Sequence, residues 1–153
     1  MKRTLLQVNN AEALPGAIDP EAVRAADIAK FIPREWAKGV LSDVENLTED
    51  KIDQILSEFQ KDFKEDSLES KGWPTTLSPY IVSKASLNAY TRLVAKKYSD
   101  FCINCLHPGY VKTDINCNSG VLTIEECAQS IVSLALLPNG GPTGLFFDIA
   151  TKF

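Results

Sequence analysis

The chain has 153 residues, of which 44% are hydrophobic and 24% charged, and it carries a net charge of -4. This composition is that of an ordinary globular protein, long enough for one domain with a core. The acidic balance argues against nucleic acid and anionic membrane surfaces as partners. No apolar run is long enough to span a bilayer or to form a signal peptide, so we expect a cytoplasmic protein.

The first 40 residues carry weak structural patterns. Residues 5–8 form a short apolar stretch that is compatible with a strand. Residues 21–31 are compatible with a short helix, with Asp19 as its cap and Pro20 at the first helical position. Neither segment has an obvious packing partner in the sequence.

An amphipathic helix is predicted over residues 48–66. Its apolar side chains recur at helical spacing, with polar residues between them: Ile52, Ile55, Leu56, Phe59 and Phe63. Thr48 fits the N-cap position, and the two acidic residues that follow it favour the helix dipole. Gly72 and Pro74 then predict a loop over residues 67–77.

A second helix is expected to follow this loop. Ser78 fits an N-cap and Pro79 fits the first position of a helix over residues 79–98. The apolar run over residues 101–106 then predicts a buried strand, which ends where a Pro-Gly pair begins a loop.

The last third of the chain completes an alternating pattern. Thr123 and Glu126 have the spacing of a capping box, which predicts a helix over residues 124–137. A turn rich in Gly and Pro leads to a short strand over residues 144–148. This order indicates an α/β architecture with a mainly parallel sheet. Two convincing strands and one doubtful strand are fewer than the about six of a complete dinucleotide-binding sheet.

The residues with the clearest chemical potential are Tyr80 and Lys84. Tyr and Lys four residues apart share one face of a helix. A phenol is a poor proton donor at neutral pH because its pKa is near 10, and a nearby ammonium lowers that pKa. The pair therefore suits general acid/base chemistry on a carbonyl or an alcohol, although an ordinary exposed helix start has the same spacing.

Two motifs around this pair resemble one enzyme family. The first reads Ser-Pro-Tyr-Ile-Val-Ser-Lys-Ala over residues 78–85, and the second reads Pro-Gly-Tyr-Val-Lys-Thr-Asp over residues 108–114. Together, at this separation, they resemble the C-terminal signature of the short-chain dehydrogenase/reductases. Further similarity over residues 33–149 points to the group that includes neomenthol dehydrogenase, salutaridine reductase and carbonyl reductase.

The resemblance implies roles for individual residues. Tyr80 would exchange a proton with the substrate oxygen and also contact the cofactor. Lys84 would bind the nicotinamide ribose and lower the Tyr80 pKa. The cofactor would be NADPH, held also by the second motif through Pro108, Gly109, Val111 and Thr113. The substrate would be a small-molecule ketone or aldehyde, or the corresponding alcohol, and the protein would be a monomer. Residues 36–77 would form a flap insertion, and residues 78–149 the catalytic C-terminal half.

The sequence also departs from the family pattern. It contains no Gly-rich T-G-x-x-x-G-I-G turn and offers no candidate for the catalytic Ser. The family's N-N-A-G motif is matched only by Asn9-Asn10-Ala11, with Glu12 in place of Gly, so Asn9 and Ala11 are candidate cofactor contacts. Residues 1–32 would be a divergent remnant.

We therefore expect a single truncated, partial Rossmann-type unit in three layers with few, mainly parallel strands. Hydride transfer needs a bound cofactor, which the family holds through the Gly-rich turn. The chain is thus expected to be weak or inactive as a reductase. The alternatives are a non-catalytic interaction protein or a degenerate fragment that self-associates or binds a full-length relative.

The Cys-x-x-Cys of Cys102 and Cys105 has two interpretations. It is the spacing of redox and zinc motifs, but the surrounding sequence is that of a strand, where these side chains point to opposite faces. The other zinc ligands are missing because His107 is the only histidine, so we favour two small buried side chains and expect no metal.

Three further side chains have both a structural and a functional interpretation. His107 ends the predicted strand before the Pro-Gly pair, and a structural role is favoured over a contact with ligand. Trp36 and Trp73 flank the predicted flap, where they could line an apolar substrate pocket or anchor the core.

Overall fold

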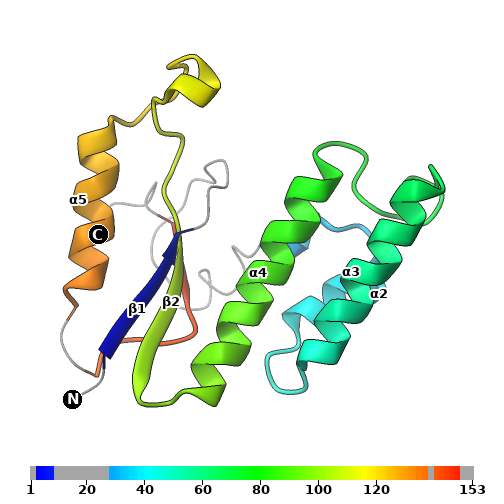
Figure 1. Ribbon diagram of the computed structural model, residues 1–153, viewed down its shortest axis with the longest axis horizontal. Helices are drawn as coiled ribbons and strands as arrows, with labels where there is room; N and C mark the ends of the chain where they lie inside the picture. Colours follow the sequence, from blue (N-terminus) through cyan, green and yellow to red (C-terminus); the bar gives the residue numbers. More distant parts are fainter. Residues whose placement is uncertain (1–2, 9–27, 138–139, 149–153) are drawn as a thin grey trace. The chain divides into compact units, whose positions relative to one another are not determined.

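The computed structural model describes residues 3–8, 28–137 and 140–148, which Figure 1 draws as a coloured ribbon. The chain divides into two compact units. The helical unit comprises Asp27–Leu93, and the sheet unit comprises Met1–Ala26 and Val94–Phe153. Each unit is described by itself. Among the described residues, no helix combines the length and the apolar character needed to cross a membrane.

The amphipathic helix of the helical unit is α3, Glu49–Lys64. Thr48 is its N-cap as predicted, since its side chain accepts a hydrogen bond from the Lys51 amide at 3.3 Å. The apolar face is buried through Ile52, Ile55 and Phe59, which confirms the helical spacing seen in the sequence. The helix ends two residues before the predicted boundary, and turns follow over residues 65–72.

The segment before α3 differs from the expectation. Only the end of the helix predicted over residues 21–31 lies among the described residues, and there Ile28–Phe31 forms a 3-10 turn, η1. A helix that the sequence did not predict, α2, spans Glu35–Ser42. Its N-cap residue makes no side-chain capping bond, so its stability depends on burial of Ala37 and Leu41 rather than on a local start signal.

The helix that carries Tyr80 is α4, Ser78–Lys97. Ser78 was predicted as its N-cap, which is wrong. The Ile81 amide donates to the Leu77 carbonyl at 2.9 Å, so the helical hydrogen bonds begin one residue earlier. The Ser78 hydroxyl instead donates to the Pro74 carbonyl in the preceding loop.

The sheet unit contains three parallel strands in the order β1, β2, β3, which span Arg3–Val8, Phe101–His107 and Phe146–Asp148. Arg3 pairs with Phe101, and Cys105 pairs with Phe146. The doubtful first strand is therefore real, and the predicted α/β architecture with a small parallel sheet is confirmed. In β2 every residue after the first is buried, as expected of a central parallel strand covered on both faces.

The helix of the sheet unit is α5, Ile124–Ala135, and its predicted capping box is present. The Thr123 amide donates to the Glu126 carboxylate at 2.8 Å, and the Glu126 amide donates to the Thr123 hydroxyl at 3.2 Å. Leu134 of α5 packs with Leu106 of β2 and Phe147 of β3 to form the core of this unit.

Candidate functional site

Tyr80 and Lys84 share one face of α4, as their spacing predicts. The Lys84 Nζ atom lies 5.8 Å from the centroid of the Tyr80 ring, and both residues are half-buried. The opposite face of α4 is buried at Val82, Ala85 and Ala89, which are at most 1% exposed. Burial of that face holds the helix backbone that carries the pair.

The Pro-Gly segment follows β2 in the sheet unit. Gly109 has a φ of +74°, and a Cβ built on it would meet the Leu122 Cδ1 atom at 2.5 Å. Any other residue here would combine an unfavourable backbone conformation with a steric clash. Glycine is thus favoured at this position by local structure, whether or not a cofactor binds nearby.

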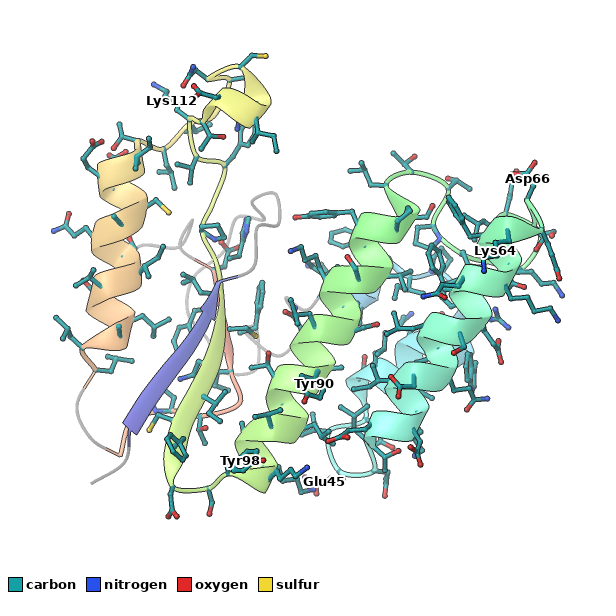
Figure 2. The ribbon with its side chains drawn as sticks, in the orientation of Figure 1. Glu45, Lys64, Asp66, Tyr90, Tyr98 and Lys112 are labelled. Atoms are coloured by element: carbon teal, nitrogen blue, oxygen red, sulfur yellow. The ribbon has the colours of Figure 1, made fainter. Side chains whose placement is uncertain are left out.

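The loop after Gly109 is closed by its own polar contacts. The Lys112 amide donates to the Leu122 carbonyl at 2.8 Å, and Figure 2 shows Lys112 in this loop. Asn116 donates to the Val111 carbonyl at 2.8 Å and accepts from the Thr113 amide at 3.1 Å. These bonds hold the backbone of the predicted cofactor contacts, and sequence reasoning assigned no role to Asn116.

The predicted site residues fall into two groups. Tyr80 and Lys84 are together in the helical unit, while a second set lies along one stretch of the sheet unit: Pro108, Gly109, Val111 and Thr113. Asn9 and Ala11 lie outside the described residues. The catalytic and cofactor-binding roles of all eight stay predictions.

The two cysteines of β2 are buried within the strand. Cys102 and Cys105 form no disulfide with each other or with another described cysteine. Their sulfur atoms contact the Gly141 and Leu145 carbonyl oxygens, respectively, at 3.6 Å. His107 is 2% exposed at the end of the same strand. Within the described part of the chain, no three His, Cys, Asp or Glu side chains gather in a group that could hold a metal ion.

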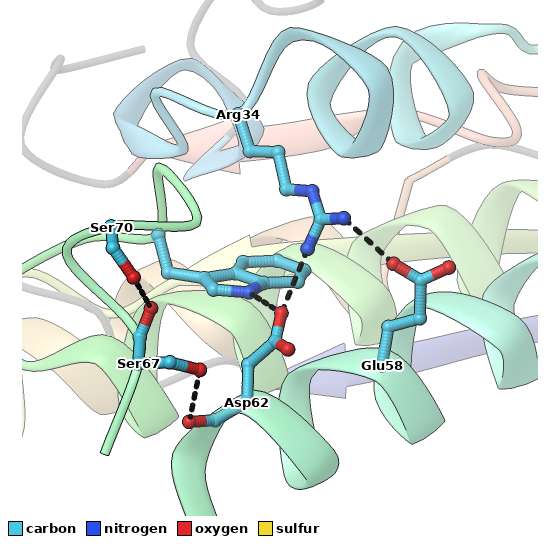
Figure 3. A network of polar contacts seen from close by, with 6 residues as sticks. Arg34, Glu58, Asp62, Ser67 and Ser70 are labelled. Atoms are coloured by element: carbon cyan, nitrogen blue, oxygen red, sulfur yellow. Dashed lines mark hydrogen bonds and ion pairs between the residues drawn. The ribbon is translucent and has the colours of Figure 1, made fainter. Parts of the chain in front are cut away.

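The sequence did not predict a partly buried polar network in the helical unit, which Figure 3 shows. The Arg34 guanidinium donates to Asp62 at 3.0 Å and to Glu58 at 2.8 Å, and the Trp73 indole donates to the same Asp62 oxygen at 2.8 Å. The hydrogen bond from Trp73, followed by the hydrogen bond and the charge of Arg34, lowers the pKa of Asp62 below its ordinary value of 3.8. We call Arg34, Asp62 and Trp73 the clamp.

Each tryptophan had been expected either to line a substrate pocket or to anchor the core, and their surroundings in the structure differ. Trp73 is 1% exposed and packs edge-on against Phe59, with ring centroids 5.2 Å apart, so it anchors the core. Trp36 is 39% exposed, and its ring lies 5.4 Å from the Arg34 guanidinium carbon. The ion pairs of Arg34 span 24 and 28 residues, which explains why local sequence patterns did not reveal the clamp.

Known proteins are similar to this chain in both sequence and fold. It is 58% identical over 118 residues to (+)-neomenthol dehydrogenase of Capsicum annuum, and 55% identical over 120 residues to short-chain dehydrogenase/reductase 1 of Saponaria officinalis. The chain belongs to the short-chain dehydrogenase/reductase family. The solved structure of salutaridine reductase from Papaver somniferum matches 95% of this reductase-family chain with a TM-score of 0.78 and 38% identity.

The family match covers only part of these relatives. The two sequence matches include 77% and 78% of this chain but 38% and 40% of the relatives, and the structural match includes 44% of salutaridine reductase. The chain thus spans about two-fifths of the length of the curated relatives it matches. No protein-family model matches it. The predicted family resemblance is confirmed by these findings.

Proposed function

We propose that this site performs the reversible, NADPH-dependent reduction of a ketone or aldehyde to an alcohol. The observation that carries the proposal is the placement of Tyr80 and Lys84 on one face of α4, with the ammonium 5.8 Å from the phenol ring, in a chain of the short-chain dehydrogenase/reductase family. NADPH, when bound, supplies the hydride that reduces the carbonyl carbon.

The two side chains would divide the proton chemistry between them. The Tyr80 phenol donates its proton to the carbonyl oxygen, which becomes the alcohol oxygen, and the phenolate remains on Tyr80. The Lys84 ammonium stabilises that phenolate and lowers the pKa of the phenol, because an opposite charge favours the ionised form. In the reverse direction the phenolate accepts the proton of the alcohol.

The residues present fit NADPH only in part. Lys84 of the helical unit offers hydrogen-bond donors for ribose hydroxyls. Gly109 of the sheet unit has no side chain to obstruct a ligand, but the Leu122 side chain lies where its Cβ would be. The sequence offers no Gly-rich turn for the pyrophosphate, a group that dinucleotide-binding folds hold at such a turn. We therefore propose that the 153-residue chain reduces carbonyl compounds weakly or not at all by itself.

The test combines unfolding with turnover. The unfolding midpoint of the chain is measured with and without excess NADPH, since a ligand that binds only the folded state raises it. We expect an upward shift that Lys84→Met diminishes, and slow NADPH oxidation with a ketone that Tyr80→Phe abolishes. An unfolding midpoint that does not change when NADPH is added would reject the proposed cofactor site. Turnover that survives Tyr80→Phe would reject the role of Tyr80.

A second function is favoured by the exposed apolar side chains of the sheet unit. Five of the described ones are more than half exposed: Ile115 at 96%, Val121 at 76%, Leu136 at 75%, Ile124 at 61% and Val132 at 53%. Exposed apolar groups of this kind mark interaction surfaces when they are contiguous. We propose self-association, or binding to a full-length relative, as the alternative role. A molecular mass of 16.8 kDa in solution, unchanged by an added relative, would reject it.

A further inference from the structure

Most serine hydroxyls of the described residues are hydrogen-bonded or buried. Seven of them donate to a backbone carbonyl: Ser67, Ser70, Ser78, Ser83, Ser119, Ser130 and Ser133. Ser86 is buried. The other three, Ser42, Ser57 and Ser99, are exposed, and no described residue forms a hydrogen bond with their hydroxyls. These three hydroxyls are therefore the ones available to a modifying enzyme.

The three available serines differ in their surroundings. Ser57 lies within α3, which would have to unwind before another enzyme could use its hydroxyl. Ser99 lies directly before β2. Ser42 is the last residue of α2, and an exposed turn over residues 44–46 follows it. Helix ends fray, so Ser42 can enter an active site with the least loss of regular structure.

Acidic side chains follow Ser42 in a distinctive pattern. Asp43 is the next residue, and Glu45 lies three positions after Ser42, in the turn where Figure 2 shows it. The Asn46 side chain and the Asn46 amide hydrogen-bond to the Asp43 carboxylate at 3.0 and 3.1 Å, which lowers the pKa of Asp43 below its ordinary value of 3.8. Protein kinases distinguish substrates by charge patterns, and this pattern fits a kinase with a basic groove beyond the acceptor serine.

A cation lies next to the peptide unit that joins Leu41 to Ser42. The Arg92 guanidinium donates to the Leu41 carbonyl and so ties the end of α2 to α4, which also carries Tyr80. Because a peptide unit is planar, this carbonyl and the Ser42 Cα atom belong to one rigid group. A guanidinium binds a phosphate more strongly than a neutral carbonyl, since the charges are opposite and two phosphate oxygens can accept from it. A phosphate on Ser42 would therefore have a cation within reach.

We propose that Ser42 is a phosphorylation site for a protein kinase that recognises acidic residues after the acceptor serine, and that the phosphate binds the Arg92 guanidinium. The Ser42 Oγ atom attacks the γ-phosphorus of ATP, so that an Oγ–P bond forms and the bond from that phosphorus to the bridging oxygen of ADP breaks. The hydroxyl proton passes to a base of the kinase, and ADP leaves. The phosphate then competes with the Leu41 carbonyl for Arg92 and changes how α2 is joined to α4. The site does not depend on the proposed reductase function.

The first experiment incubates the 153-residue chain with ATP and casein kinase II, a kinase that selects serines followed by acidic residues. Intact mass measures phosphate incorporation, and peptide mapping locates it. We expect a single phosphate that is absent from Ser42→Ala and present in the matched controls Ser57→Ala and Ser99→Ala. Glu45→Gln should slow incorporation several-fold, whereas Glu49→Gln, which lies further from the acceptor, should not.

Three outcomes of this experiment would overturn the assignment. They are no incorporation into the folded chain, incorporation that persists in Ser42→Ala, and equal rates for Glu45→Gln and the unmodified chain. The third outcome would show that the acidic pattern does not direct the kinase. None of these results bears on NADPH oxidation, so the reductase proposal stands or fails separately.

The second experiment tests the pairing of the phosphate with Arg92 by phosphorus NMR. The second pKa of a phosphoserine is about 6, and a nearby guanidinium lowers it. We expect this pKa to be about 1 lower in the folded phosphorylated chain than in the same chain unfolded in urea. Arg92→Gln should remove most of this difference, whereas Arg92→Lys, which keeps the charge, should retain part of it.

The nearby carboxylates of Asp43 and Glu45 act on the phosphate in the opposite direction, and all of these chains retain them. An equal phosphate pKa in the folded and the urea-unfolded unmodified chain would overturn the pairing, even if Arg92→Gln did not fold. A difference that Arg92→Gln leaves unchanged in a folded chain would overturn it as well, because another cation would then be responsible.

Discussion

The helical unit and the sheet unit are stabilised in different ways. In the helical unit, a polar network links Arg34 with Asp62 over 28 residues of sequence and packs against a buried tryptophan. The sheet unit has three strands and a small core around Leu106, while α5 and the loop before it leave large apolar side chains exposed. The comparison indicates that a long-range polar network stabilises the unit that carries Tyr80 and Lys84, whereas the described part of the sheet unit depends on a small apolar core. Both units also expose apolar side chains, such as Phe63 in the helical unit and Ile115 in the sheet unit.

The largest expected effect tests whether the helical unit depends on its buried tryptophan. Trp73→Ala should lower the free energy of unfolding by about 3–5 kcal/mol, because it leaves a cavity and removes a donor from Asp62. Trp36→Ala is the control, since this side chain is 39% exposed, and should have an effect of about 1 kcal/mol or less. Urea unfolding gives both values, and hydrogen exchange should show lost protection in the helical unit. An equal loss of protection in both units would contradict their separate stabilisation.

Two glycine-to-alanine substitutions compare the tolerance of the loop in the sheet unit with that of a helix in the helical unit. A Cβ on Gly120 would lie 2.3 Å from the Lys112 amide nitrogen, so Gly120→Ala must displace backbone and should destabilise the chain by about 1–3 kcal/mol. A Cβ on Gly39 meets nothing within 4 Å, so Gly39→Ala within α2 should stabilise by about 0.5–1 kcal/mol. Denaturant titration of each variant gives the change in the free energy of unfolding and shows whether it is positive or negative. Destabilisation by Gly39→Ala would show that α2 is not a regular helix in solution.

The smallest expected effect concerns the clamp in acid. Because the pKa of Asp62 is lowered in the folded state, its ionised form contributes stability above the unfolded pKa of about 3.9. This contribution is lost as the pH falls through the folded pKa. The groups that face or influence Asp62 are Trp73, Arg34 and Lys71, and Glu58 shares the guanidinium.

The measurement is the unfolding midpoint of the unmodified chain and of Asp62→Asn between neutral pH and about pH 2. We expect the unmodified chain to be the more stable at neutral pH, and the difference to shrink below about pH 4. A difference that is independent of pH would show that the charge of Asp62 does not contribute. A difference that grows on acidification would mean that the pKa of Asp62 is raised.

Structural features that depend on residues close in sequence could be predicted from the sequence. The N-cap at Thr48, the capping box of Thr123 with Glu126, and the shared face of Tyr80 and Lys84 all depend on residues at most four apart. The sequence did not reveal α2, which is short, contains Gly39 and lacks a side-chain cap. Its helical state depends on burial of Leu41, which only the folded unit provides.

The sequence predicted the pair of Tyr80 and Lys84, but it did not predict the structure of the segments around them. The sequence placed the N-cap of α4 at Ser78, because serine is a common capping residue, but the hydroxyl donates to the loop and Leu77 accepts the first helical bond. Neither the left-handed conformation of Leu77 nor the clamp follows from local preference, since leucine avoids this conformation and Arg34 contacts residues far along the chain.

The pairing of β1 with β2 has a consequence for the kinetics of folding. Arg3 and Phe101 are direct neighbours in the sheet, although most of the chain lies between them. During synthesis β1 leaves the ribosome long before its partner strand exists, whereas the backbone hydrogen bonds of α3 join residues that are close in sequence. Because long-range parallel pairing is slow, we expect the helical unit to form early and closure of the sheet to limit the folding rate. Until β2 emerges, the first strand of the nascent chain remains available to chaperones.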